Sequence, residues 1–155
     1  MEKIIREGSV RFSIITNSLL RIEEDIEKVF EDRPSTTVLN RSFGEVNAEI
    51  IRNHNNHILE IVTPSFHLYY DGGSLSPISL YVDIKKSSSL YHNRWFFGKK
   101  NGTKNLKGTV RTLDRADGEV PLEDGLMSKD GFSSLDDSTN FLYIKDSDSF
   151  VARRK

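Results

Sequence analysis

Short runs of alternating apolar and polar residues, each bounded by turn-forming residues, recur along most of this sequence of 155 residues. The clearest pair covers residues 46–52 and 57–62, which flank an asparagine-rich turn. Asparagine tolerates the positive φ angles of tight turns, and alternation places one face of each strand against a core. This pair predicts a β-hairpin, and its repetition predicts antiparallel sheets instead of helices or a parallel α/β fold.

Further segments share this character, because they are rich in β-branched or aromatic residues and bounded by Gly, Pro, Asn, Asp or Ser. They are residues 9–16, 19–25, 36–43, 66–70, 76–85, 95–98 and 141–154, the last broken into a hairpin at 146–149. Pro34 sets the entry to the segment 36–43, since proline removes a ladder donor and belongs at strand ends. Residues 21–32 carry isoleucines near helical spacing, and we interpret them as an irregular loop. The pattern predicts an antiparallel sandwich or barrel.

Composition limits the class of protein and its partners. A chain of this length can bury the core of one domain without disulfide or metal cross-links. The absence of cysteine excludes disulfides and thiolate metal sites. The 22 Lys and Arg nearly balance the 23 Asp and Glu, so no long-range field favours nucleic acid or an anionic membrane. The N-terminus lacks the apolar run of a secretory signal or membrane span. We therefore expect a cytoplasmic protein that binds neither nucleic acid nor membrane.

Residues 99–138 stand outside the regular pattern. They form a connection with little periodicity, far longer than usual, and they contain an acid-rich stretch, 113–131, with three glycines. Connections of this length in compact domains are generally functional or disordered. The sequence also ends at FVARRK, directly after a predicted strand, and we expect it to be one piece of a longer polypeptide.

Three stretches carry a family likeness: SLLRIEE at 18–24, FEDRPSTTVLNRSF at 30–43, and the long acid-rich stretch at 105–138. Together they resemble the N-terminal domain of family 31 glycoside hydrolases, the α-glucosidase group. The resemblance implies that residues 1–155 form an all-β, galactose-mutarotase-like antiparallel β-sandwich with a long irregular loop. In that family the sandwich precedes a (β/α)8 barrel that holds the active site, and a loop of the sandwich reaches over the mouth of the barrel.

The departures from the family pattern determine the expected activity. The barrel motif resembling W-x-D-M-N-E, which carries the nucleophile, is missing from this sequence, as is the barrel segment with the acid/base. We therefore assign no catalytic residue and no cofactor, and we expect the chain alone to be inactive. The resemblance implies a role in an enzyme that hydrolyses terminal α-linked glucose with retention. The expected partners are an α-glucoside or oligosaccharide substrate and the missing catalytic barrel of the same polypeptide.

Asp117 and Asp124 are the predicted substrate-binding acids, each directly before a glycine. Carboxylates accept hydrogen bonds from neighbouring sugar hydroxyls, and glycine lets the backbone approach a ring closely. The adjacent pair Glu123 and Asp124 cannot serve as two catalytic carboxyls, because neighbours in an extended segment point to opposite sides. Trp95 is the third candidate, as a platform for a sugar ring. It is followed by two phenylalanines, and three aromatics in a row cannot share one strand face, so at least one is expected in the core.

The same residues are compatible with other functions. A stand-alone carbohydrate-binding module would use Trp95 and the acidic stretch, and a scaffold without ligand would use neither. A calcium loop starting at Asp114 fits poorly, because glycine falls at the fifth position and Pro121 interrupts the ligands. His54 and His57 belong to a hairpin tip, so no metal site is predicted. His67 sits in a strand, where a backbone carbonyl is the expected partner.

Overall fold

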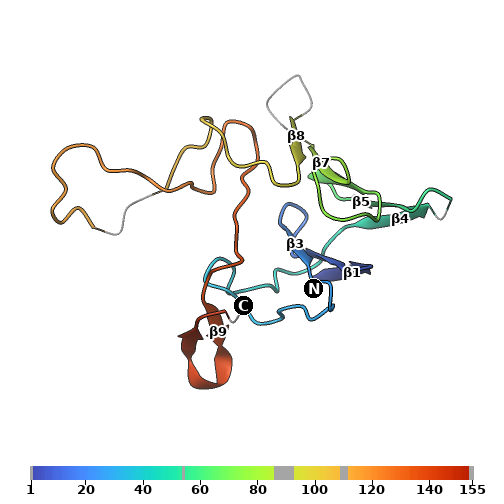
Figure 1. Ribbon diagram of the computed structural model, residues 1–155, viewed down its shortest axis with the longest axis horizontal. Helices are drawn as coiled ribbons and strands as arrows, with labels where there is room; N and C mark the ends of the chain where they lie inside the picture. The colour runs from blue at the N-terminus through green and yellow to red at the C-terminus, as the bar shows by residue number, and fades with distance from the viewer. Residues whose placement is uncertain (1, 54, 86–92, 109–111, 154–155) are drawn as a thin grey trace.

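The computed structural model describes residues 2–53, 55–85, 93–108 and 112–153 (Figure 1). The first sheet contains, in spatial order, β1 (Lys3–Glu7), β2 (Val10–Ile14) and β3 (Leu20–Glu24). The second sheet contains, in spatial order, β4 (Glu49–Asn53), β5 (Ile58–Val62), β6 (Phe66–Tyr70), β7 (Leu80–Ile84) and β8 (Asn93–Phe96). A hairpin of β9 (Leu142–Ile144) and β10 (Ser149–Val151) encloses the 3-10 turn Lys145–Ser147. Each pairing in these sheets is antiparallel, as the alternating pattern predicts.

The first two sheets share one apolar core. Alternate residues of each strand point into it, and the ring of Phe12 on β2 meets the edge of Tyr70 on β6 with centroids 5.3 Å apart. The buried members of the core are Ile5, Val10, Phe12, Ile14, Val46, Leu59, Ile61, Phe66, Leu68, Tyr70, Leu80 and Val82. This two-layered arrangement confirms the prediction of an all-β antiparallel sandwich. Its galactose-mutarotase-like character stays a prediction.

Strand β2 is buried on both faces, because residues 25–47, here called the strap, supply partners for its second face. Arg11 lies on that face and is only 1% exposed. Its guanidinium lies 2.7 Å from the carboxylate of Glu23, pairs with Asp32, and donates to the carbonyl of Glu31 at 2.9 Å. Burial by itself lowers the pKa of Arg11, but the hydrogen bonds to Asp32 and Glu23 outweigh burial and raise it. The strap is thus tied to the sheet by a buried charge.

The predicted strand at 36–43 is wrong. These residues follow an irregular path in the strap, where the nearest ladder contact is an isolated bridge between Ser35 and Leu142. Leu39 and Phe43 are 51% and 55% exposed, so the apolar residues of this segment do not mark a buried face. β-Branched residues form a strand only where a partner strand lies alongside. The predicted loop, in contrast, is confirmed after β3, where a turn at Asp25 replaces any helix in 25–32.

Strand β1 was not predicted, because its charged residues hide the alternation. Within it Ile5 alone belongs to the buried core. At the side where β1 and β4 form the sheet edges, side chains link the two layers. Lys3 Nζ donates to the carbonyl of Ala48 at 2.9 Å, and Arg52 lies 3.3 Å from Glu7. Charged side chains thus occupy both free edges.

Acid should weaken the strap through Glu31. A hydrogen bond from the Arg33 side chain lowers the pKa of Glu31 from 4.5 to about 2. A depressed carboxyl pKa stabilises the folded state above 4.5, and this contribution is lost as the pH falls from 4.5 to about 2. Replacing Arg33 by alanine should therefore reduce the loss of stability across that interval. Urea denaturation midpoints of both proteins, measured through the interval, check this; parallel curves would contradict it.

Candidate functional site

The long connection 99–138, here called the excursion, leaves the sandwich after β8 and returns to β9 (Figure 1). Its two arms, 101–108 and 123–134, run side by side and form the stem. Leu106 donates its backbone N–H to Met127 at 2.9 Å, and Gly108 donates to Glu123 at 2.7 Å. Beyond the stem, residues 112–122 form the distal loop, drawn in orange at the end farthest from the second sheet. The irregular region therefore has an organised base and a projecting tip.

Asn105 organises the stem. It is 5% exposed, and its amide spans the gap between the two arms. Its Nδ2 donates to the carbonyl of Gly125 at 2.9 Å, while its Oδ1 accepts from the N–H groups of Gly125 at 2.9 Å and Lys107 at 2.8 Å. Sequence reasoning missed this residue, since a lone asparagine in a turn-rich segment gives no sign of burial.

A second asparagine joins the two arms at the base of the stem. Asn101 Nδ2 donates to the Ser134 carbonyl at 2.8 Å, and Asn101 Oδ1 accepts from the Ser134 N–H at 2.9 Å. At the base, the indole Nε1 of Trp95 donates to the carbonyl of Lys99 at 3.0 Å. Side-chain amides and one indole therefore replace the regular ladder that this region lacks.

Trp95 lies on the core side of β8. Its ring packs edge-on against Phe97 with centroids 6.0 Å apart, and both rings adjoin the buried core. Phe96 points the other way and is 40% exposed. The expectation that at least one of these aromatics is a core residue is confirmed. Because its N–H is hydrogen-bonded and its ring packs inward, these contacts favour a structural role for Trp95 over a role as a sugar platform.

Asp124 lies in the stem, paired with a lysine of the opposite arm. Lys107 Nζ is 2.6 Å from Asp124 Oδ1, and this hydrogen bond is the main cause of the lowered pKa of Asp124. The carboxylate is therefore ionised at neutral pH and already has a partner. Any sugar hydroxyl would have to share it with that ammonium.

Asp117 lies in the distal loop and is exposed. The loop is shaped by a turn in which Ala116 donates to Leu113 at 3.0 Å, with positive φ at Arg115 and Gly118, 61° and 98°. Within the described residues, the Asp117 carboxylate has no hydrogen bond or ion pair. The three predicted residues are thus spread over β8, the stem and the distal loop. The structure does not bring them together into one pocket.

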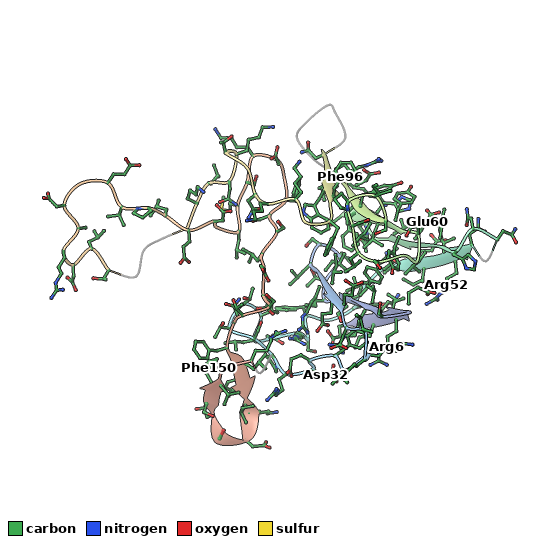
Figure 2. The ribbon with its side chains drawn as sticks, viewed as in Figure 1. Arg6, Asp32, Arg52, Glu60, Phe96 and Phe150 are labelled. Carbon is green, nitrogen blue, oxygen red and sulfur yellow. The ribbon has the colours of Figure 1, made fainter. Side chains whose placement is uncertain are left out.

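The outer face of the second sheet carries an aromatic row that the sequence did not single out. His67 stacks on Tyr69 with centroids 4.1 Å apart, and Tyr69 stacks on Tyr81 at 4.8 Å. Glu60 and Phe96, both labelled in Figure 2, lie on the same face, opposite Tyr69 and Tyr81. His67 Nε2 lies 2.7 Å from Glu60 Oε2, so its predicted backbone partner is wrong. Tyr69 is covered by a ring on each side, and the guanidinium of Arg94 lies 4.2 Å from the ring centroid of Tyr81, so the faces of these two tyrosines are not presented to a sugar.

A surface depression of about 520 Å³ lies beside β3, away from the predicted residues. It is lined by Ser9, Glu24, Asp25, Ile26, Glu27 and Ser74. Two of its carboxylates are already engaged, since Glu24 accepts from the N–H of Leu75 at 3.3 Å and Asp25 from that of Glu27 at 2.7 Å. This depression therefore has acids but no aromatic side chain in its lining on which a sugar ring could stack.

The described part of the chain contains neither a metal-ligand cluster nor a membrane-spanning helix. No group of three His, Cys, Asp or Glu side chains in those ranges is placed to hold a metal ion. His57 sits exposed at its hairpin tip with φ 58°, while His54 lies outside the described residues. No helix in the same ranges is long and apolar enough to cross a membrane.

Comparison with family models and curated proteins adds no relative. No protein-family model matches the chain, and no curated protein matches it. The family resemblance therefore rests on the three stretches at 18–24, 30–43 and 105–138.

Proposed function

We propose that this chain is the N-terminal, non-catalytic sandwich domain of a family 31 type α-glucosidase, which hydrolyses terminal α-linked glucose with retention. In this proposal the excursion reaches a catalytic barrel, and the distal loop narrows the substrate pocket. The observation that carries the proposal is the excursion itself: an ordered stem that holds an acidic loop away from the sandwich. The resemblance of residues 105–138 to the family supports the same assignment.

The amount of exposed surface supports a macromolecular partner for the excursion. The chain exposes 11175 Å², whereas a compact protein of this mass exposes roughly 8,000 Å². A protein interface of standard size buries about 800 Å² on each partner. The surplus is therefore large enough for an extensive interface.

The types of side chain exposed on the excursion also fit a macromolecular partner. Apolar side chains of the excursion are 43% to 77% exposed, far more than a solvated connection requires. They are Leu106, Leu113, Leu122, Leu126, Met127 and Leu135. Around the distal loop, Asp114, Asp117, Glu119 and Glu123 outnumber the single described cation, Arg115. The partner surface that would match the excursion is apolar, with basic side chains at its rim.

The proposed separation between a non-catalytic sandwich and a catalytic barrel is tested first with the chain alone and with its gene. The chain should not hydrolyse p-nitrophenyl α-glucoside, and activity above background would contradict the proposal. Reading the coding sequence beyond Lys155 should reveal a (β/α)8 barrel with its two carboxylates. A stop codon there, combined with glycan-array binding by the chain, would favour a stand-alone carbohydrate-binding module instead.

The role of Asp117 is tested in the complete enzyme. Asp117→Asn should lower kcat/KM on maltose-type substrates by about ten- to a hundredfold, the value of a charged hydrogen bond of about 1.5–3 kcal/mol. Asp114→Asn, in the same loop, is the matched control and should change kcat/KM far less. Steady-state kinetics of the two variants decide the matter. An unchanged kcat/KM for Asp117→Asn would remove this residue from the substrate pocket.

A further inference from the structure

The chain contains four Asp–Gly pairs, and the structure treats them differently. They are Asp71–Gly72, Asp117–Gly118, Asp124–Gly125 and Asp130–Gly131. Asp–Gly is the pair most open to backbone isomerisation, because glycine has no Cβ to block the approach of its nitrogen to the aspartyl carbon. Reaction requires that both the carboxyl group and the glycine N–H are free to move.

Three of the pairs are held. Asp124 pairs with Lys107 at 2.6 Å, and the N–H of Gly125 donates to Asn105 at 2.9 Å. Asp130 pairs with Lys104 at 2.9 Å, while the N–H of the next glycine donates to Ser128 at 3.1 Å.

The carboxylate of Asp71 is held by a hydrogen bond within its own turn. Its Oδ1 accepts from the N–H of Gly73 at 2.8 Å, and its own N–H donates to the carbonyl of Ser79 at 3.0 Å. A hydrogen bond to the carboxylate or from the glycine N–H must open before an imide can form, so each such bond slows the reaction.

Asp117–Gly118 differs from the other three. Asp117 is exposed in the distal loop, and neither its carboxylate nor the N–H of Gly118 makes a hydrogen bond to any residue in the described ranges. We propose that Asp117–Gly118 is a site of spontaneous isoaspartate formation, singled out among the four pairs by the absence of restraint. This inference concerns the chain itself and does not rest on the proposed function.

The chemistry balances with water alone. The nitrogen of Gly118 attacks Cγ of Asp117, a C–N bond forms, and one water leaves as the carboxyl C–O bond breaks. Water then adds to the imide and opens it at either carbonyl. Opening at the main-chain carbonyl gives isoaspartate, in which the chain runs through the former side chain and the carboxylate sits one carbon closer to it. The tip of the distal loop thereby changes its shape and the position of its charge.

The test is incubation of the whole chain in neutral buffer, followed by proteolysis and peptide-resolved mass spectrometry with isoaspartyl methyltransferase labelling. Short peptides around each pair provide the unrestrained rates. Asp117 in the folded chain should convert nearly as fast as its peptide, while each held pair should convert about tenfold more slowly than its own peptide. Conversion at Asp117 as slow as at the held pairs would overturn the proposal.

Two variants sharpen the result. Asp117→Glu should abolish the product at this position, because the six-membered imide forms far more slowly. Lys107→Ala should raise isoaspartate at Asp124 while leaving Asp117 unchanged. An unchanged rate at Asp124 would contradict the protective role given to restraint. Deamidation at Asn101–Gly102 is distinguished because it changes the mass of its peptide, whereas isomerisation does not.

Discussion

Replacing Arg11 by alanine should lower the free energy of unfolding by about 3–5 kcal/mol, the usual cost of removing one partner from a buried ion pair. The guanidinium is 1% exposed, and the carboxylate of Glu23 that it contacts is 13% exposed. Without Arg11, Glu23 still has Arg21 at 2.8 Å, and the carbonyl of Glu31 loses one donor. Asp32 contributes less to the loss, since its side chain is 79% exposed and remains hydrated.

Urea denaturation followed by tryptophan fluorescence measures this effect. Arg52→Ala is the matched control, because its ion pair with Glu7 lies on the surface, with the two side chains 45% and 39% exposed. Exposed pairs contribute about 0–1 kcal/mol. Similar midpoints for the two variants would show that the strap is not held by the Arg11 cluster.

Replacing Gly125 by valine should dismantle the stem. A Cβ at this position would lie 2.4 Å from the carbonyl oxygen of Lys107 and 2.7 Å from its carbon, distances that real Cβ atoms essentially never show. Because these atoms belong to the backbone, the arms must separate, and the cost is about 1–3 kcal/mol, as for other overpacked sites. Separation also breaks both hydrogen bonds between Gly125 and Asn105.

Hydrogen exchange resolves this local effect from global stability. The backbone amides of Leu106 and Gly108 should lose protection, while those of the second sheet keep it. Gly102→Ala is the control, since a Cβ at Gly102 meets nothing within 4 Å. Full protection of the stem amides in the valine variant would contradict the role given to this glycine.

The sandwich was predictable where alternation and turn chemistry agree. In the hairpin of β4 and β5 the antiparallel pairing and the asparagine-rich tip follow from local sequence. Residues 36–43 carry the same residue types but have no partner strand, and pairing depends on distant segments that local patterns do not reveal. The same limit explains why β1 was not predicted. Ile5 is its one residue in the buried core, and β1 is recognised as a strand by its pairing with β2 and not by its own composition.

The candidate site was predictable only in part. Position next to glycine pointed to Asp117 and Asp124, yet it did not distinguish a free carboxylate from one paired with Lys107. Trp95 was chosen for its residue type, whereas its orientation depends on the pleat of β8. Asn105 was missed because its burial arises from two arms that meet across 20 residues of sequence. Such contacts are set by tertiary structure, which composition and spacing do not encode.

The isolated bridge between Asn105 and Ser128 has an entropic consequence. It divides the closure of one very long connection into two shorter ones, and the cost of closing a loop rises only slowly with its length. Insertions or substitutions at the tip then alter the inner segment without burdening the folding of the two sheets. The stem therefore allows the sequence of the distal loop to change while the sandwich stays the same.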